Sequence, residues 1–314
     1  SESRGLGDVY KRQDMLGAAL LPIDGSVLGD EIEIQTSDAY SLDYAGRFKD
    51  VLPQDISKNI VTDCYRHFTA CMQERGIDYS PASMTLHKHL PIGSGLGSSA
   101  SSIVAALYGL NEFYQKPFNE HEMLAMMGTL EGQISGSVHY DNVAPSYLGG
   151  LTLITELEDQ IASRLPAIDD WYWVVCYSGV HVSTSAAREI LPQEVSLKTT
   201  IKFGQQLAIF VDALHRQDAK QALAVVNDVI AEPYRKELLP YFDESRQFAL
   251  ENGAGAFGIS GSGPTVFAVC DDLSQAQKIN DWLSQHYIQN DAGFSHICKL
   301  DLQGSRSVSY THLR

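Results

Sequence analysis

The sequence predicts an α+β fold in two domains. Segments with strand patterns and segments with helix patterns follow one another in a mixed order rather than as a regular strand–helix–strand series, which argues against a doubly wound parallel sheet. The chain has 314 residues, a length that suits two modest hydrophobic cores. Its most informative feature is a glycine-rich loop between a strand pattern and a helix pattern in the first half of the chain.

The glycine-rich loop predicts a phosphate site. Residues 84–90 alternate apolar and polar side chains as a half-buried strand does, and apolar residues recur at helical spacing from Ile103 to Phe113. Glycines let the backbone approach a ligand closely, and the N–H groups at the start of a helix attract negative charge. We expect a nucleotide phosphate to be held by the loop residues Pro91, Ile92, Gly93, Ser94, Gly95, Leu96, Gly97, Ser98, Ser99 and Ala100.

Two common phosphate motifs do not describe this loop. A Walker A motif requires a lysine that is absent here, and the glycine spacing differs from the dinucleotide pattern G-x-G-x-x-G. A tight turn that merely caps the following helix is therefore the alternative to phosphate binding.

The elements after the loop lead to a candidate domain boundary. Asn119 and Glu122 have the spacing of a capping box, which predicts a helix with Glu131 well inside it. Gly149-Gly150 indicates a turn, and a strand pattern follows over residues 151–155. The acidic and less regular segment 156–170 is the expected boundary, which gives domains over residues 1–156 and 157–306.

The second domain is expected to contain both strands and helices. Strand patterns cover residues 171–177, 265–270 and 294–300, and helix patterns cover residues 197–216, 218–231, 236–252 and 274–287.

Composition excludes several classes of protein. The chain has 23 Lys and Arg against 39 Asp and Glu, a formal net charge of −16, which argues against duplex nucleic acid or an anionic membrane as partner. Its five cysteines are scattered, without zinc or disulfide spacing, and we interpret them as reduced core residues. No apolar run reaches the length of a membrane span, and no signal peptide pattern opens the chain. We therefore expect a cytoplasmic enzyme.

Two loops carry a resemblance to a known family. The pattern P-x-x-x-G-L-G-S-S-A at residues 91–100 resembles the central signature of the GHMP kinases, which include galactokinase, homoserine kinase, mevalonate kinase and phosphomevalonate kinase, and residues 258–265 are similar to their C-terminal signature. Residues 139–145 and 231–235 resemble segments of the homoserine kinases. The resemblance runs from about residue 14 to about residue 301. It implies an N-terminal nucleotide-binding α+β domain, a C-terminal ferredoxin-like α+β domain, and ATP with Mg²⁺ as cofactors.

The resemblance implies a role for three residues on the nucleotide side. Ser99 and Glu131 match the magnesium ligands of the family, and hard oxygen ligands suit this ion. The alternatives are an N-cap role for Ser99 and a solvated helix face for Glu131. Asn59 resembles a position near the adenine.

The resemblance also implies L-homoserine as the substrate. Arg188 and Arg235 match the two arginines that hold the amino-acid end in homoserine kinases, and a guanidinium suits a carboxylate because its planar fork binds both oxygens. Asn142 matches a contact near the reacting hydroxyl, and Asp14 matches one near the amino group. Thr184 stands where mevalonate kinases place a catalytic Asp.

These matches imply a phosphoryl transfer without a strong general base, so that catalysis rests on positioning and charge neutralisation. Asp141 is the candidate base that remains, although an Asx turn or a helix N-cap is the preferred interpretation of this residue. We therefore expect homoserine kinase activity, with O-phospho-L-homoserine as product, a place in threonine biosynthesis, and a homodimer. The alternatives are another small-alcohol kinase of the family and an inactive ATP-binding protein.

The ends of the chain and two histidines complete the predictions. Residues 1–13 and 307–314 do not resemble the family and are similar to adapter-derived tails, so we expect neither to be native and the first family strand to be lost. His87 and His89 lie on the polar side of a strand, and we expect them simply to be exposed.

Overall fold

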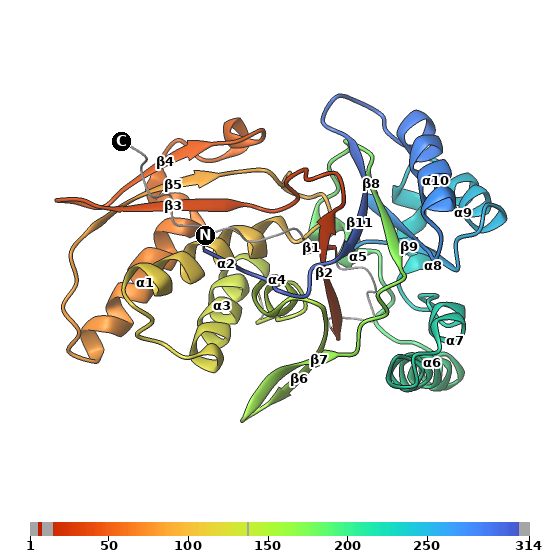
Figure 1. Ribbon diagram of the computed structural model, residues 1–314, viewed down its shortest axis with the longest axis horizontal. Helices are drawn as coiled ribbons and strands as arrows, with labels where there is room; N and C mark the ends of the chain where they lie inside the picture. The colour runs from red at the N-terminus through yellow and green to blue at the C-terminus, as the bar shows by residue number, and fades with distance from the viewer. Residues whose placement is uncertain (1–5, 8–14, 137, 308–314) are drawn as a thin grey trace.

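The protein is described by a computed structural model that covers residues 6–7, 15–136 and 138–307. In this part of the chain the strands form two sheets, and the helices lie against both (Figure 1). The strands are β1 (Leu6–Gly7), β2 (Leu16–Pro22), β3 (Glu31–Thr36), β4 (Ser41–Ala45), β5 (Ala82–His87), β6 (Leu151–Leu157), β7 (Gln160–Leu165), β8 (Tyr172–Tyr177), β9 (Ala256–Ile259), β10 (Thr265–Cys270) and β11 (Phe294–Leu300). The helices are α1 (Ile60–Glu74), α2 (Ser98–Phe113), α3 (Glu120–Ser135), α4 (Val143–Leu148), α5 (Thr184–Glu189), α6 (Leu197–His215), α7 (Ala219–Ala224), α8 (Glu232–Arg235), α9 (Phe242–Glu251) and α10 (Leu273–His286), with 3-10 turns η1 (Lys49–Val51), η2 (Ile56–Lys58) and η3 (Lys236–Leu238).

The smaller sheet belongs to the first half of the chain. Its order is β3-β5-β4, and it covers a core shared with α1, α2 and α3 (Figure 1). Along β5 the side chains of Ala82, Met84 and Leu86 are buried and alternate with partly exposed ones, so the half-buried strand predicted before the glycine-rich loop is confirmed.

The larger sheet has the order β7-β6-β2-β11-β8-β10-β9. Within it, β8, β9, β10 and β11 are joined in the sequence β-α-β-β-α-β, all neighbours are antiparallel, and the crossover helices α9 and α10 pack on one face. This arrangement is ferredoxin-like, as expected for the C-terminal half. The helices α6 and α7 cover the opposite face, where Phe210 and Leu214 pack near Trp173 and Phe267.

The two halves of the chain share this larger sheet, because β2 pairs with both β6 and β11. The segment 156–170, expected to be less regular, contains the end of β6 and all of β7, which form an antiparallel hairpin. The expected boundary between residues 156 and 157 therefore falls inside a hairpin. A short strand is also present near the start of the chain, since Leu6 and Gly7 pair with β2. That residues 1–13 are not native and that the first family strand is lost stay predictions.

Local signals explain where helices begin and end. Asn119 and Glu122 form the predicted capping box at the start of α3. The helix predicted over residues 218–231 ends at Ala224, because the Asp228 side chain accepts from the backbone N–H groups of Ile230 and Ala231 and holds a turn there. The helix predicted over residues 236–252 is broken at Pro240, since proline cannot donate the backbone hydrogen bond that a helix interior requires.

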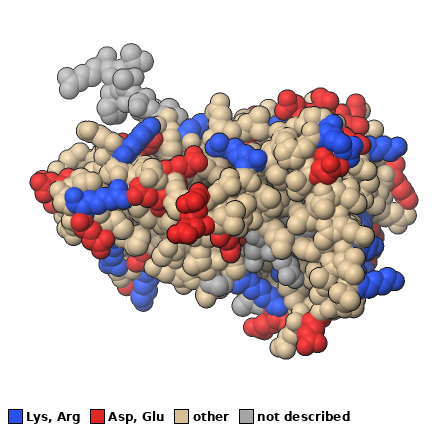
Figure 2. Space-filling model, turned by 90° about the horizontal axis from the view of Figure 1, so that it is seen from below, with Lys and Arg blue, Asp and Glu red and all other residues tan. Residues whose placement is uncertain are grey.

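The structure shows the state of the cysteines and the distribution of charge on the surface. All five cysteines are free, and four of them are buried whereas Cys71 is partly buried. Burial raises the pKa of the Cys176 and Cys270 thiols to about 12. The prediction of core cysteines is therefore confirmed for Cys64, Cys176, Cys270 and Cys298. Lys and Arg side chains are interspersed with Asp and Glu over the face seen in Figure 2 rather than gathered into one basic surface. Within the described residues, none of the helices is long and apolar enough to cross a membrane.

A buried ion pair connects the smaller sheet to the start of α2. Lys88 is 2% exposed, and its Nζ pairs with Asp30, which is fully buried. The same Nζ donates to the carbonyl oxygen of Ser98 at 2.8 Å and to Ser102 Oγ at 2.9 Å. Asp30 Oδ1 accepts from the backbone N–H groups of His89 and Leu90 at 2.9 and 3.1 Å. These contacts fix the first turn of α2 relative to the strands.

We expect Lys88→Met to lower the free energy of unfolding by about 3–5 kcal/mol, because it leaves the Asp30 carboxylate buried without its cation. The double variant Asp30→Asn/Lys88→Met should lose clearly less than the sum of the two single variants, since an amide oxygen can still accept from the two backbone N–H groups. Urea denaturation of the four proteins measures both effects. Additive losses would contradict the coupling.

Candidate active site

A cavity of about 330 Å³ lies where the glycine-rich loop meets a second glycine loop, residues 258–265. The wall comes from both halves of the chain, since Gly261 and Ser262 line it together with residues that precede α1 and others on α2, α3 and α5. The remaining lining residues are Leu52, Pro53, Lys58, Asn59, Ile60, Leu86, Lys88, Ile92, Gly93, Ser94, Gly95, Gly97, Ser98, Ser99, Ser102, Glu131, Ile134, His139, Asp141, Asn142 and Arg188.

The first loop has the conformation of an anion cradle. Gly93, Gly95 and Gly97 have φ values of 71°, 78° and 65°, which side-chain-bearing residues rarely adopt. Gly97 is the N-cap of α2 and offers no side-chain cap, so Ser98 and Ser99 stand in the first helical turn at the cavity. The N–H groups and positive dipole end of a 16-residue helix therefore face the space. This geometry supports the phosphate interpretation over a plain capping turn, and it removes the alternative of Ser99 as N-cap.

The two loops are in direct contact, through one side-chain and one backbone hydrogen bond and through closely approaching backbones. Ser260 Oγ donates to the carbonyl oxygen of Gly95 at 2.9 Å, and the N–H of Thr265 donates to the carbonyl oxygen of Ser94 at 3.2 Å. A Cβ placed on Gly261 would lie 2.6 Å from the Gly95 carbonyl oxygen, and one placed on Gly95 would lie 2.3 Å from the Ser260 carbonyl oxygen. Both positions therefore require glycine.

Ser99 and Glu131 lie together, as the metal prediction requires. Ser99 Oγ donates to Glu131 Oε1 at 2.8 Å, and both residues line the cavity. Glu131 is only 8% exposed, so it does not belong to a solvated helix face. The pair offers hydroxyl and carboxylate oxygens to one point beside the phosphate loop, a donor set that fits Mg²⁺.

Three of the residues expected near the substrate also line the cavity: Asp141, Asn142 and Arg188. The Asn142 amide donates from Nδ2 to Asp141 Oδ2 at 3.0 Å. Asp141 is 2% exposed and is not the N-cap of α4, a position that Asn142 occupies without a side-chain cap. The interpretation of Asp141 as a helix N-cap is therefore wrong, and its alternative, an Asx turn, stays a prediction. Arg188 Nη2 lies 3.1 Å from Nε2 of His139, which is also in the wall.

Arg235 is close to this group but does not line the cavity. It is 5% exposed, and its guanidinium donates to the carbonyl oxygens of Ala187 at 3.1 Å and Gly261 at 3.2 Å. Through these bonds Arg235 connects α5, which carries Arg188, to the second glycine loop. The structure thus shows a positioning contact for Arg235, whereas Arg188 reaches the cavity itself.

The other predicted residues have different outcomes. Asn59 lines the cavity, but its side-chain oxygen accepts a hydrogen bond from the N–H of Val61, because Asn59 is the N-cap of α1. Three residues of the predicted cradle do not line the cavity: Pro91, Leu96 and Ala100. Ala100 is buried in the core of the smaller sheet, and Leu96 is buried in the core beneath α6 and α7. Thr184 begins α5. Asp14 and the segments 8–13 and 308–314 lie outside the described residues.

Two cations of the wall, Lys58 and Lys88, were not predicted from the sequence. A signal for Lys88 was present, because it has the same phase along the strand as Met84 and Leu86 and so points inward. A lysine at an inward position of a half-buried strand is seldom tolerated without a partner. Lys58 stands in a 3-10 turn without such a pattern.

Comparisons with known proteins agree with this geometry. Residues 59–150 match the family model for the GHMP kinases N terminal domain, and residues 210–289 match the model for the GHMP kinases C terminal domain. The homoserine kinase of Cytophaga hutchinsonii is 30% identical, with a TM-score of 0.84 over 96% of this chain and 94% of that chain.

Two further solved structures share the fold. A putative homoserine kinase from Listeria monocytogenes is 19% identical, with a TM-score of 0.66 over 96% of each chain. The L. major mevalonate kinase, solved in complex with R-mevalonate, is 17% identical, with a TM-score of 0.66 over 93% of this chain and 90% of that chain. The chain therefore belongs to the GHMP kinase family, whose members are ATP-dependent phosphotransferases.

Gly261→Ala should disturb the phosphate loop, because its Cβ would meet the Gly95 carbonyl oxygen. We expect a clear rise in KM for ATP and a loss of stability beyond the cost of the backbone angle. Gly76→Ala is the matched control: Gly76 has a similar φ, 69°, and a Cβ there meets nothing within 4 Å. The control should lose only about 1 kcal/mol of stability and keep its KM for ATP. Equal effects of the two substitutions on KM would contradict the account of the two loops.

Proposed function

We propose that this chain transfers the γ-phosphoryl group of ATP to the side-chain hydroxyl of L-homoserine, giving O-phospho-L-homoserine and ADP. The observation that carries the proposal is the position of Arg188, a guanidinium in the wall of the same cavity that the phosphate loop and the Ser99–Glu131 pair also line. A cavity that must accept a phosphate chain and a carboxylate needs both the helix terminus and this cation.

The nucleotide is held at the first loop. The backbone N–H groups at the start of α2 bind phosphate oxygens, and Lys58 and Lys88 line the same cavity. Lys88 is engaged by Asp30 and by the Ser98 carbonyl oxygen, so it also holds the loop in place. Asn59 and Ile60 form part of the wall near the start of α1, where the adenine is placed by this proposal.

Ser99 and Glu131 hold the divalent cation of this proposal. When bound, Mg²⁺ neutralises the charge of the phosphates during transfer. Ser99 orients the Glu131 carboxylate by the hydrogen bond of 2.8 Å that joins them. Helix α3 fixes the position of this carboxylate, because its capping box and its buried face set the helix against the core.

The acceptor is oriented by side chains opposite the loop. Arg188 binds the α-carboxylate, and the Asn142 amide, held by Asp141, directs the hydroxyl. Asp141 is the carboxylate best placed to receive the hydroxyl proton. Positioning and charge neutralisation supply most of the rate enhancement, as a loose phosphoryl-transfer transition state permits. Asp14, Thr184 and Arg235 complete the proposed substrate site, with Arg235 acting through α5 and the second loop.

A second candidate function is the phosphorylation of another small alcohol, and the fold shared with mevalonate kinases favours keeping it. Mevalonate also carries a carboxylate that Arg188 can bind, but it has no ammonium group. A protein that binds ATP without transferring its phosphate is the third candidate. The proposal further places the enzyme in threonine biosynthesis, in the cytoplasm and as a homodimer.

The substrate assignment is tested by ADP release in the presence of ATP and Mg²⁺ with L-homoserine, mevalonate, shikimate or galactose. The proposal predicts a kcat/KM for L-homoserine well above those for the other alcohols, since only homoserine presents both a carboxylate and an ammonium group. Equal values for homoserine and mevalonate would overturn it.

Glu131→Gln keeps the shape of the side chain and removes its charge. We expect kcat to fall by about two orders of magnitude and the Mg²⁺ concentration at half-maximal rate to rise, because a bound metal contributes several kcal/mol to catalysis. Glu120→Gln, at an exposed position of the same helix, is the control and should keep both values. Unchanged kinetics in Glu131→Gln would remove this residue from the metal site.

Arg188→Gln should weaken substrate binding by about 2 kcal/mol, as expected for the loss of a desolvated contact between opposite charges, and should leave the KM for ATP nearly unchanged. Arg66→Gln, an exposed arginine paired with Asp63 on α1, is the control. Steady-state kinetics with each substrate varied separates the two constants. A loss confined to ATP would assign Arg188 to the phosphates instead.

A further inference from the structure

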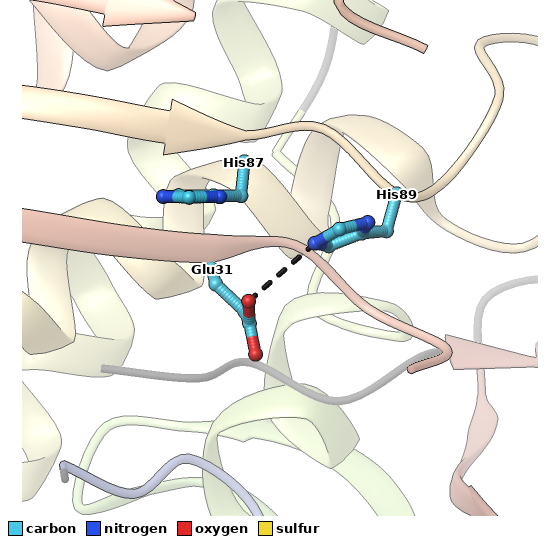
Figure 3. A group of neighbouring side chains, drawn as sticks. All are labelled: Glu31, His87 and His89. Atoms are coloured by element: carbon cyan, nitrogen blue, oxygen red, sulfur yellow. Dashed lines mark ion pairs between the residues drawn. The ribbon is translucent and has the colours of Figure 1, made fainter. Parts of the chain in front are cut away.

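We propose that Glu31, His87 and His89 form a binding site for a divalent transition metal ion, with Zn²⁺ as the representative ion (Figure 3). None of the three residues lines the cavity of the active site. The inference is independent of the proposed phosphoryl transfer.

Two neighbouring strands bring the three side chains together. Glu31 opens β3 and is paired in the antiparallel register with His87, the last residue of β5. His89 follows two positions later, and its side chain lies beside the other two, with the Glu31 carboxylate turned toward its ring (Figure 3). One ligand atom from each residue lies within 4.8 Å of the other two. Three donors from a cross-strand pair and its extension therefore surround one point.

The spacing is close to that of a bound ion. At metal–ligand distances of about 2.1 Å, two ligands of a tetrahedral ion lie about 3.4 Å apart. Nε2 of His89 and Oε2 of Glu31 are 3.4 Å apart, which already meets this requirement. The side chains of His87, His89 and Glu31 are about one quarter exposed, at 26%, 24% and 27%. They can therefore close the remaining distance by small rotations, and an ion can enter from solvent.

Glu33 lies close enough to one ligand to orient it when an ion binds. Its Oε1 lies 3.2 Å from Nε2 of His87. Histidines that bind a metal through one ring nitrogen usually donate the other N–H to a carboxylate, which fixes the ring and raises its basicity. His87 Nε2 makes no hydrogen bond in the structure, but a small rotation of the ring would let it donate to Glu33 while Nδ1 binds the ion. The set then consists of two imidazoles and one carboxylate, with a position left for water.

The donor set selects a different ion from that of the active site. Imidazole nitrogen suits Zn²⁺ and neighbouring transition metals, whereas Mg²⁺ prefers an all-oxygen site such as Ser99 with Glu131. Zn²⁺ and Mg²⁺ can therefore bind to the same chain at separate places.

The position of the three residues gives the ion a mechanical role. Lys88 lies between His87 and His89 in the sequence and points to the opposite side, where it pairs with Asp30, the neighbour of Glu31. A metal ion would thus connect β3 and the end of β5 on the outer side, while the buried ion pair connects the same strands on the inner side. Because the ion binds the folded arrangement, it should raise stability by linkage.

The test uses the full chain, freed of metal by a chelator and dialysed, and titrated with ZnCl₂ against a chromophoric chelator. The variants are His89→Gln, His87→Gln and Glu31→Gln. His67→Gln is the matched control, because His67 contacts Cys71 at 3.9 Å and is the alternative imidazole–thiol pair for zinc. Glu131→Gln controls for the active site. Circular dichroism checks the fold of each protein.

We expect one Zn²⁺ per chain, a loss of affinity of at least about tenfold in each of the three ligand variants, and no change in either control. Glu33→Gln should weaken binding by about tenfold, as loss of an orienting carboxylate does. The thermal midpoint should rise with ZnCl₂ and not with MgCl₂. Co²⁺ should give the intense absorption bands of a tetrahedral site in the parent protein and lose them in Glu31→Gln.

Zinc affinity that is unchanged in the ligand variants, or that is lost in His67→Gln or Glu131→Gln, would overturn the assignment. Such a result would mean that His87 and His89 only form cross-strand ion pairs with Glu33 and Glu31. If a histidine variant does not fold, Glu31→Gln and the cobalt spectrum still decide the question.

Discussion

The site depends on one constraint, the backbone contact between the two glycine loops. Gly95 and Gly261 lie so close that neither can carry a side chain, and the carbonyl oxygens of Ser94 and Gly95 are bound by residues of the second loop. The cradle at the start of α2 is therefore held in its conformation by residues more than 160 positions away in the sequence. This contact also explains why the cavity has walls from both halves of the chain, and why Arg235 matters although it lies behind the wall: it binds the Gly261 carbonyl oxygen and α5 together.

Positive charge at the cavity must come from groups close to it, because the chain as a whole carries a net charge of −16. Lys88 contributes less than its position suggests, since Asp30 neutralises it within the protein. In the proposed function, the attraction for phosphate therefore comes mainly from the positive end of α2 and from the cation that Ser99 and Glu131 would hold. Lys58 adds a smaller part, because it is itself paired with Asp55 at 3.9 Å. In the proposed function, Arg188 binds the acidic substrate and these other groups bind the nucleotide, so the two sets of contacts stay separate.

The sequence predicted those features that depend on local pattern. The loop between strand and helix and the capping box of Asn119 and Glu122 follow from spacing. The shared role of Ser99 and Glu131 was predicted only from the family resemblance. Features decided by tertiary packing were not predictable in the same way. Nothing in the sequence distinguishes Arg188, which reaches the cavity, from Arg235, which binds backbone behind it. The proximity of His87 and His89 to Glu31 needs the cross-strand register, which the polar side of a single strand does not reveal. The break at Pro240 was visible in the sequence and was overlooked.

The proposed reaction transfers a phosphoryl group to an amino-acid hydroxyl rather than to water. ³¹P NMR of a reaction that contains the protein, ATP, Mg²⁺ and L-homoserine tests this most directly, because it distinguishes a phosphate ester from inorganic phosphate. The account predicts a new phosphomonoester resonance that grows in step with ADP, and that is absent when homoserine is left out. ADP accompanied only by inorganic phosphate, or no turnover at all in a folded protein that binds ATP, would contradict it.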